Sequence, residues 1–333
     1  MSESKLQIGF GEYDRTRVLV DGTVKIEGVD ASFHSNRIVT EVFAGMIRDC
    51  TYDVAELGLT YFLRTMDFDE PPFIALPIFP NRCFRHSAIY INVDSGIQQP
   101  ADLAGKTVGE FAMYGHDAGV WTKGILSDDY GVKPDQCRWI VGRLDWPLKQ
   151  IDFVPQPHPA NIDVTYASQG TDLGKLLETG EIDALISADV PKCVLEKSLK
   201  VARLFVDYQT TEREYYQRTK IFPIMHTVVV RKELASKHPE ILQAVYKGFC
   251  EAKNTVEEQY TRNMIFNNMA TMIPWVSKLI DDDRSLLGED WWPYGLEANR
   301  KAVDTFLRYH FEQGLSKRRL TCEDIFVPKL LGT

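Results

Sequence analysis

The chain has 333 residues, of which 44% are hydrophobic and 26% charged, and these values are typical of a globular protein and exclude a disordered or fibrous one. At about 100–200 residues per domain, this length predicts two packed domains. The net charge is −9 at pH 7, and no run of Lys or Arg is long enough to follow a phosphate backbone, which argues against nucleic acid as a partner.

Short apolar runs alternate with helical patterns through the first two thirds of the chain, which favours parallel sheets covered by helices. The expected strands are 6–10, 24–33, 53–59, 73–79, 87–93, 106–111, 137–141, 183–188 and 201–206. The expected helices are 38–49, 115–130, 171–180 and 211–220. From Pro239 onward helical periodicity dominates, in 240–260 and again in 296–314.

Two segments are candidates for crossings between two lobes. The apolar run 84–93 leads into the turn-rich stretch 95–106, and 224–232 returns as an extended apolar run just before the helical third. We therefore predict a discontinuous first lobe, 1–92 plus 225–333, and a second lobe, 93–224.

The termini and the cysteines indicate the compartment. The start MSESKLQIGF has no basic stretch followed by an apolar run, and no window of about 18 apolar residues occurs, so we expect neither an export signal nor a membrane span. The six cysteines are scattered singly, without CxxC spacing. Reduced, mostly buried thiols in a cytoplasmic protein fit this pattern.

Several segments resemble one enzyme family, in the same order and over nearly the whole chain. They are YDVAELGL, PIFPNRCFRHSAIYIN, ADLAGKTVGE, YGHDAGVWTKGIL, FPIMHTVVVRKELASKHP and WWPYGLEANR. The family is that of 4,5-dihydroxyphthalate decarboxylase. The resemblance implies an α/β, two-lobed type 2 periplasmic-binding-protein-like fold with two crossing strands, here followed by a helical C-terminal third. It also implies a carboxy-lyase of bacterial phthalate degradation, a form of aromatic catabolism.

The implied reaction is nonoxidative decarboxylation of 4,5-dihydroxyphthalate, or a close hydroxylated aromatic acid, to protocatechuate and CO2. The departing carboxylate is para to a hydroxyl, so removing the phenolic proton pushes electron density onto the carbon that must be protonated. Such a site needs a base near the phenol, an acid over the ring carbon, cations for the remaining carboxylate and a less polar place for the departing one. No organic cofactor is required.

The segment NRCFRHS offers two guanidinium forks and an imidazole, from Arg82, Arg85 and His86. An Arg fork matches a carboxylate bidentately, and in an acidic protein a local cluster of cations favours an anion site. In an extended segment residues 82 and 86 share one face, so Arg82 with His86 is the better-supported pair. The plain alternative is surface arginines paired with acidic neighbours.

A second cluster lies where an expected strand turns into an expected helix. Tyr114, His116 and Asp117 flank a glycine turn, where free backbone N–H groups and the helix dipole favour an anion. Asp117 is also an acceptable N-cap, and His116 is either an acid or base or a solvated turn residue. Tyr114 is expected to help position the substrate ring.

Two further groups lie in apolar runs. His226, at the return crossing, is either a core histidine or a functional one, and Glu56, at a strand end, either accepts a catechol hydroxyl or caps a turn. His86, His116 and His226 are thus the candidate catalytic acid and base, with the roles unassigned. We expect the remaining histidines to have structural roles: His34, His158, His238 and His310.

Aromatic and apolar residues near the C-terminus allow two interpretations. Trp291, Trp292 and Tyr294 either enclose an aromatic ligand or pack in the core. Apolar positions of helix 295–313 form either the interface of a homo-oligomer or a lobe core.

Two other kinds of function remain open. In a metal-dependent decarboxylase, His86, His116 and His226 would converge on a divalent ion, although neither HxH nor HExxH spacing occurs. In a solute-binding protein, the same cleft would hold a small aromatic carboxylate without chemistry. Neither a G-x-S-x-G elbow nor a GxGxxG dinucleotide motif is present. We favour the decarboxylase without cofactor or metal.

Overall fold

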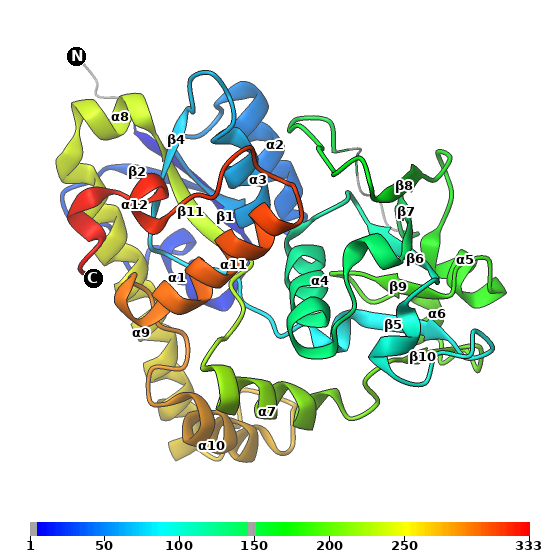
Figure 1. The fold of residues 1–333 in the computed structure, drawn as a ribbon. Helices are drawn as coiled ribbons and strands as arrows, with labels where there is room; N and C mark the ends of the chain where they lie inside the picture. Colours follow the sequence, from blue (N-terminus) through cyan, green and yellow to red (C-terminus); the bar gives the residue numbers. More distant parts are fainter. Residues whose placement is uncertain (1–4, 146–148, 150) are drawn as a thin grey trace.

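Two β-sheets form the two halves of the molecule in the computed structural model, which describes residues 5–145, 149 and 151–333 (Figure 1). The first sheet has the strand order β2-β1-β3-β11-β4. Its strands are β1 (Leu6–Gly11), β2 (Ala31–Asn36), β3 (Val54–Gly58), β4 (Phe73–Leu76) and β11 (His226–Arg231). β1, β2 and β3 run parallel, and β11 lies antiparallel between β3 and β4.

The second sheet has the order β10-β5-β9-β6-β7-β8. Its strands are β5 (Ile89–Asn92), β6 (Thr107–Phe111), β7 (Arg138–Gly142), β8 (Asp163–Tyr166), β9 (Ala184–Ile186) and β10 (Val201–Arg203). β9, β6, β7 and β8 are parallel, whereas β5 is antiparallel to both of its neighbours. Each sheet is thus mostly parallel, as the alternation of strands and helices predicted.

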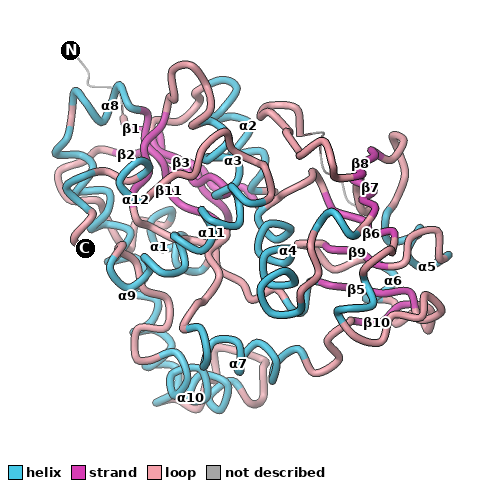
Figure 2. Tube along the Cα trace, viewed as in Figure 1, coloured by secondary structure: helices cyan, strands magenta, loops and turns pink. Residues whose placement is uncertain are grey.

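Helices cover both sheets (Figure 2). In the first half they are α1 (Asp14–Val20), α2 (Val39–Asp49), α3 (Leu59–Thr65), α8 (Lys232–Lys237), α9 (Pro239–Ile265), α10 (Val276–Leu287), α11 (Arg300–Glu312) and α12 (Cys322–Ile325). In the second they are α4 (Asp117–Tyr130), α5 (Leu173–Thr179), α6 (Lys192–Leu195) and α7 (Tyr208–Thr219). Within the described residues, none of the helices has both the length and the apolar character needed to span a membrane.

The strands of the first sheet are apolar because both of their faces are buried. Ile8 and Phe10 of β1 and Val228 of β11 pack against Phe249 of α9, while Leu57 of β3 points to the other face, toward α2 and α3. Burial on both faces is the usual state of a parallel sheet flanked by helices. Polar residues at the ends of these strands therefore stand out from an apolar background.

The two crossing segments pair with each other between the sheets. The Cys83 N–H donates to the Pro223 carbonyl at 3.1 Å, and the Met225 N–H donates to the Asn81 carbonyl at 2.9 Å. The crossing thus lies before β5, and β5 pairs with β9 and β10 of the second sheet. The predicted ranges 1–92 plus 225–333 and 93–224 place this strand in the first lobe, which is wrong because hydrophobicity alone does not say which sheet a strand joins.

Other expectations differ from the structure in detail. Only the end of the expected strand 24–33 belongs to β2. The elements that were not predicted are β8 and the helices α1, α3, α6, α8, α10 and α12. The apolar positions of helix 295–313 are mostly buried: Ala302, Val303, Phe306 and Leu307 are core residues of α11. Packing within the lobe therefore accounts for them, and they do not point to a subunit interface.

Helix α4 lies between the two sheets, where it contacts α11 and the return crossing (Figure 1). The Trp121 indole N–H donates to the Ile224 carbonyl at 2.8 Å, and the Gln313 side-chain amide donates to the Val120 carbonyl at 2.9 Å. Gly124 lies directly against the ring of Tyr309, so that a Cβ at this position would overlap the ring. This close approach holds the middle of α4 in a fixed place between the lobes.

We expect Gly124→Ala to lower the free energy of unfolding by about 1–2 kcal/mol, because overpacking against Tyr309 outweighs the better helix propensity of alanine. Urea denaturation measures the change. Gly332→Ala is the control, since a Cβ there meets nothing within 4 Å. Equal urea midpoints for both variants and the wild type would contradict the close packing of α4 on α11.

Candidate active site

A buried glutamate in the middle of β3 holds a histidine of the first lobe. Glu56 Oε1 accepts hydrogen bonds from His226 Nδ1 at 2.6 Å and from the Tyr13 hydroxyl at 2.8 Å, and Oε2 accepts from the Gly11 N–H at 2.8 Å. Because a carboxylate only accepts, Nδ1 of His226 carries a proton, and Nε2 is the ring nitrogen left to meet a ligand. None of the described residues hydrogen-bonds to this Nε2 atom. We call this pair the first dyad.

The sheet places the first dyad. Glu56 and His226 lie on neighbouring antiparallel strands, with His226 opposite Gly58. Phe43 of α2 packs edge-on against the His226 ring, with centroids 5.2 Å apart. Burial, followed by the influence of Glu56, raises the pKa of Tyr13, so its hydroxyl keeps its proton and donates to the glutamate. The imidazole is therefore fixed in both orientation and tautomer.

A second dyad of the same kind comes from the second lobe. Glu110 of β6 is fully buried, its Oε1 lies 3.3 Å from His116 Nδ1, and the same atom accepts from the Gly115 N–H at 2.9 Å. Glu110 Oε2 accepts from Lys123 Nζ at 2.6 Å. His116 is 4% exposed, and its Nε2 is buried without a partner among the described residues. A buried nitrogen of this kind is expected to meet a ligand or a water molecule.

The Glu110–Lys123 pair is ionised. Burial lowers the pKa of Lys123 to about 8, with Glu110 opposing that change. Burial acts to raise the pKa of Glu110, but Lys123 and His116 outweigh it and the pKa is lowered. The Lys123 ammonium also lies 3.6 Å from the centroid of the Tyr114 ring. This charged network fixes the loop that carries His116.

Asp117 lies where the two lobes meet. Its Oδ1 accepts the N–H of Thr60, at the start of α3 in the first lobe, at 2.8 Å. Burial raises its pKa, while His226, Thr60, His116 and Arg85 act in the opposite direction. The sequence also allowed Asp117 as the N-cap of the helix. In the structure His116 is the N-cap of α4, and Asp117 is the first helical residue. Its carboxyl group reaches across to the other lobe instead.

Arg85 is a buried cation without an acidic partner. It is 7% exposed, and its Nε donates to Met225 Sδ at 3.1 Å. No carboxylate of the described residues lies within ion-pair distance, although Arg85 influences the pKa values of Asp117, Asp189 and Glu212. Since an unpaired buried charge is unfavourable, the guanidinium is well suited to receive an anion.

Asp189, after β9, is a neighbour of Arg85 and His116 that the sequence did not reveal. Loss of hydration beside the neighbouring protein raises the pKa of Asp189, and His116 and Arg85 oppose this change. The side chain still keeps contact with solvent. Tyr13 and Glu110 were also missed. The sequence did contain one indication of Glu110. The segment TVGEF carries a single glutamate in an apolar strand, as the segment VAELG does at Glu56.

Arg82 does not belong to this group. Its guanidinium donates to the Pro293 carbonyl at 2.6 Å, to Asn299 Oδ1 and, at 3.4 Å, to the Phe222 carbonyl. Burial lowers its pKa to about 9. Arg82 thus joins the crossing to the segment before α11, and the protein already occupies the fork that was predicted to hold a carboxylate.

His86 is equally remote from the two dyads. It begins a 3-10 turn, His86–Ala88, and packs edge-on against Phe205 and Tyr215, where burial lowers its pKa to about 4. Its nearby charges are Asp129, at the far end of α4 and roughly 18 Å from Asp117 along a helix of this length, and the Arg218 of α7 that pairs with Asp129. The predicted pairing of Arg82 with His86 is wrong because the segment does not stay extended.

Tyr114 also differs from its expected role. Its ring is fully buried in the second lobe, against Lys123 and edge-on to Trp139 and His158. Its carbonyl accepts from Arg64 Nη2 at 2.7 Å. Tyr114 therefore supports the loop through its backbone, while its ring packs against Lys123, the ion-pair partner of Glu110.

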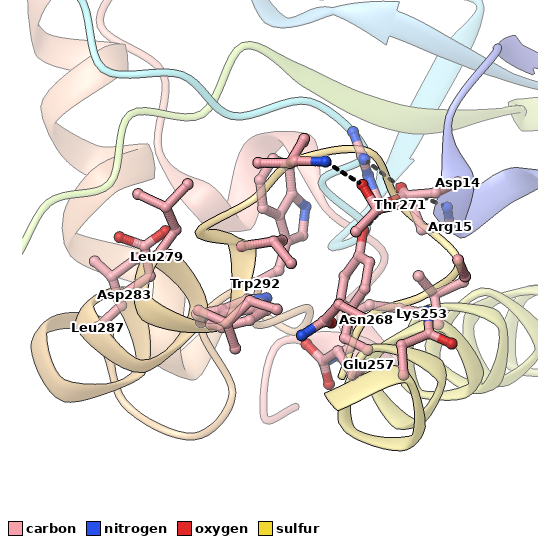
Figure 3. Close-up of a pocket in the computed structure, with 18 of the residues that line it drawn as sticks. Asp14, Arg15, Lys253, Glu257, Asn268, Thr271, Leu279, Asp283, Leu287 and Trp292 are labelled. Atoms are coloured by element: carbon pink, nitrogen blue, oxygen red, sulfur yellow. Dashed lines mark hydrogen bonds and ion pairs between the residues drawn. The ribbon is translucent and has the colours of Figure 1, made fainter. Parts of the chain in front are cut away.

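The tryptophans line a separate cavity of roughly 560 Å³ between α9 and α10 (Figure 3). Arg15 forms one wall, stacked 4.2 Å from the Tyr13 ring centroid and 4.4 Å from that of Trp292. Its Nε donates to the Pro80 carbonyl at 2.7 Å, so this cation is already paired. The cavity is mainly apolar and contains none of the histidines, and Arg15 and Tyr13 separate it from the first dyad.

The metal alternative finds no support in the placement of the histidines. Among the residues that the structure describes, no group of three or more His, Cys, Asp or Glu side chains is arranged to hold a metal ion. His86 in particular lies away from His116 and His226. The three histidines therefore do not converge as that alternative requires.

Two α/β lobes joined by two crossing segments give the chain a type 2 periplasmic-binding-protein-like fold, as predicted. SsuA, the periplasmic aliphatic sulphonate binding protein of Escherichia coli, superposes with a TM-score of 0.55 at 13% identity, covering 98% of this chain and 92% of that one. DszB in complex with biphenyl-2-sulfinic acid gives 0.54 at 14% identity, covering 98% of both chains. These likenesses show the fold.

Sequence similarity is closer. The chain is 37% identical over 331 residues to the 4,5-dihydroxyphthalate decarboxylase of Comamonas testosteroni, covering 99% of this chain and 98% of that protein. It is 35% identical over 217 residues to the enzyme of the same name from Pseudomonas putida, covering 65% and 83%. The chain belongs to the 4,5-dihydroxyphthalate decarboxylase family, as its motifs indicated. No family model matches it.

We expect Arg82→Ala to lower the free energy of unfolding by about 3–5 kcal/mol, because it leaves buried oxygen acceptors without their charged donor. Arg85→Ala is the matched comparison and is expected to change stability by less than about 1 kcal/mol, since it removes a buried charge that has no ion pair. Urea denaturation of both variants measures the difference. Equal losses of stability would contradict the separate roles assigned to the two arginines.

Proposed function

We propose that this protein removes one carboxylate from 4,5-dihydroxyphthalate as CO2 and releases protocatechuate. Membership of the family supports the substrate. The observation that carries the proposal is the pair of glutamate-held histidines from opposite lobes, with the unpaired Arg85 beside them. A protein that only binds its ligand has no need for two imidazoles held in a fixed tautomer.

The reaction needs proton transfer at two ends of one ring. The phenolic oxygen and the carbon that loses CO2 are para to each other, so the base must reach the ring edge at the oxygen and the acid must reach the ring face at the carbon. His226 is suited to take the phenolic proton at Nε2, because Glu56 holds Nδ1 and stabilises the imidazolium that forms. Arg85 is suited to hold the carboxylate that remains.

The proposed place of the reaction is the cytoplasm. All six cysteines are free thiols, which suits a reducing compartment. The two alternatives are separated by experiment. Unchanged 4,5-dihydroxyphthalate bound to the protein would indicate a solute-binding protein, and loss of activity after chelation with recovery on adding a divalent metal would indicate a metal-dependent enzyme.

The proposed reaction is tested with purified protein and 4,5-dihydroxyphthalate. We expect stoichiometric release of CO2 and protocatechuate, and Arg85→Ala should raise the KM about 100-fold because a charge-assisted, bidentate contact is lost. Measuring both products by chromatography and CO2 trapping checks this. A wild-type protein that binds the substrate but releases no CO2 would overturn the proposal.

The first dyad is tested by Glu56→Gln. The amide still accepts from His226 but no longer stabilises its protonated form, so kcat should fall by about 10²–10⁴-fold with little change in KM. Asp128→Asn, at the far end of α4, is the control and should keep the wild-type kcat and pH profile.

A further inference from the structure

We infer that Asp117 is the catalytic acid that protonates the ring carbon losing CO2, and that the first lobe holds it in position. The inference rests on the proposed decarboxylation. It goes beyond the three histidines as candidate acid and base, because it assigns the proton to a carboxyl group that was expected only to bind substrate.

The position of Asp117 depends on contacts between the lobes. Its residue belongs to α4 of the second lobe, but Oδ1 is fixed by the Thr60 N–H of the first lobe at 2.8 Å. The Thr60 hydroxyl in turn donates to the Gly115 carbonyl at 2.8 Å, and Arg64 donates to the Tyr114 carbonyl at 2.7 Å. These contacts hold the loop 114–117 against α3, so Asp117 is placed correctly only when the lobes are together.

Gly58 makes room for the second oxygen of Asp117. Gly58 lies opposite His226 in the pairing of β3 with β11, and a Cβ at Gly58 would overlap Asp117 Oδ2. The missing side chain therefore lets Oδ2 lie against Gly58, the residue that pairs with His226 of the first dyad. With Oδ1 held by Thr60, Oδ2 is the atom left to carry a proton toward a ligand.

The burial of Asp117 favours its protonated form. Burial raises its pKa, against the influence of the cations and donors around it. The groups that face it are His226 from β11, the Thr60 N–H, Tyr61 and Arg64 from α3, its neighbour His116, and Arg85 from the crossing. A carboxyl group that stays protonated can act as an acid where an ordinary aspartate is already ionised.

The second histidine is a less suitable acid. Glu110 holds Nδ1 of His116, so Nε2 is the ring nitrogen left to meet a ligand. With its Nδ1 proton directed at Glu110, the ring is placed to accept a hydrogen bond from a substrate hydroxyl at Nε2. His116 is thus assigned to substrate positioning.

The resulting steps balance. His226 Nε2 takes the phenolic proton, the electron pair of the oxygen moves through the ring, and the para carbon forms a C–H bond with the proton of Asp117. The C–C bond to the carboxylate then breaks, CO2 leaves, and the electron pair of that bond restores the aromatic ring and the phenolate. The phenolate recovers its proton from His226, and Asp117 is reprotonated from water. One proton from solvent is consumed for each CO2.

The test compares the full-length wild type with Asp117→Asn and Asp117→Glu, using 4,5-dihydroxyphthalate. An asparagine Oδ1 keeps the Thr60 hydrogen bond but provides no acid, so kcat should fall by about 10²–10⁴-fold while the substrate Kd changes less than about threefold. The glutamate variant should keep a measurable part of kcat. In the wild type kcat should fall as pH rises through the pKa of Asp117, and this limb should be absent in Asp117→Asn.

A kcat of Asp117→Asn within about threefold of the wild type, in protein that releases CO2, overturns the inference alone. A wild type that releases no CO2 overturns the proposed function together with it. If Asp117→Asn does not fold, Gly58→Ala serves instead, because it displaces the carboxyl group and removes no titrating side chain. Folded Gly58→Ala should lose kcat to a similar degree, and a wild-type kcat would overturn the inference.

Discussion

The arrangement of this site depends on the burial of two carboxylates that lie within strands, Glu56 of β3 and Glu110 of β6. A fully buried carboxylate must be given hydrogen-bond donors, and each of these glutamates receives them from a backbone N–H, a histidine and one further side chain. Satisfying Glu56 fixes the turn after β1 and the first residue of β11. Satisfying Glu110 fixes the start of α4. The imidazoles are therefore oriented by a requirement for stability as much as by their chemistry.

The two neighbouring arginines show how the local backbone divides structural from functional roles. Arg82 lies where the crossings pair, surrounded by carbonyl oxygens that need a donor. Three residues later, beyond that pairing, Arg85 meets only a methionine sulfur and no acidic partner among the described residues. The first guanidinium is thus part of the connection between the lobes, and the second is left with a charge that an anion can satisfy.

Much of the fold could be predicted from the sequence, and less of the site. Hydrophobic alternation indicated most strands, and Glu56, Arg85, His116, Asp117 and His226 were all named from their local setting. Their pairing was not predictable, since Glu56 and His226 are 170 positions apart and meet only through the register of β3 with β11. The 3-10 turn at His86 reversed the assumed face of its segment, and local periodicity does not reveal such a turn.

A binding fold of two lobes needs few additions to become a proton-transfer enzyme. Strand ends from both lobes already meet around a ligand, and one oriented histidine gives a base. The acid is more demanding, because a carboxyl group keeps its proton only where water is kept away. Anchoring Asp117 to Thr60 of the opposite lobe meets this demand, since separation of the lobes would expose the carboxyl group to water and favour its ionised form. Protonation of the acid and enclosure of the substrate then depend on the same contact, so the proton is available where the ring is held.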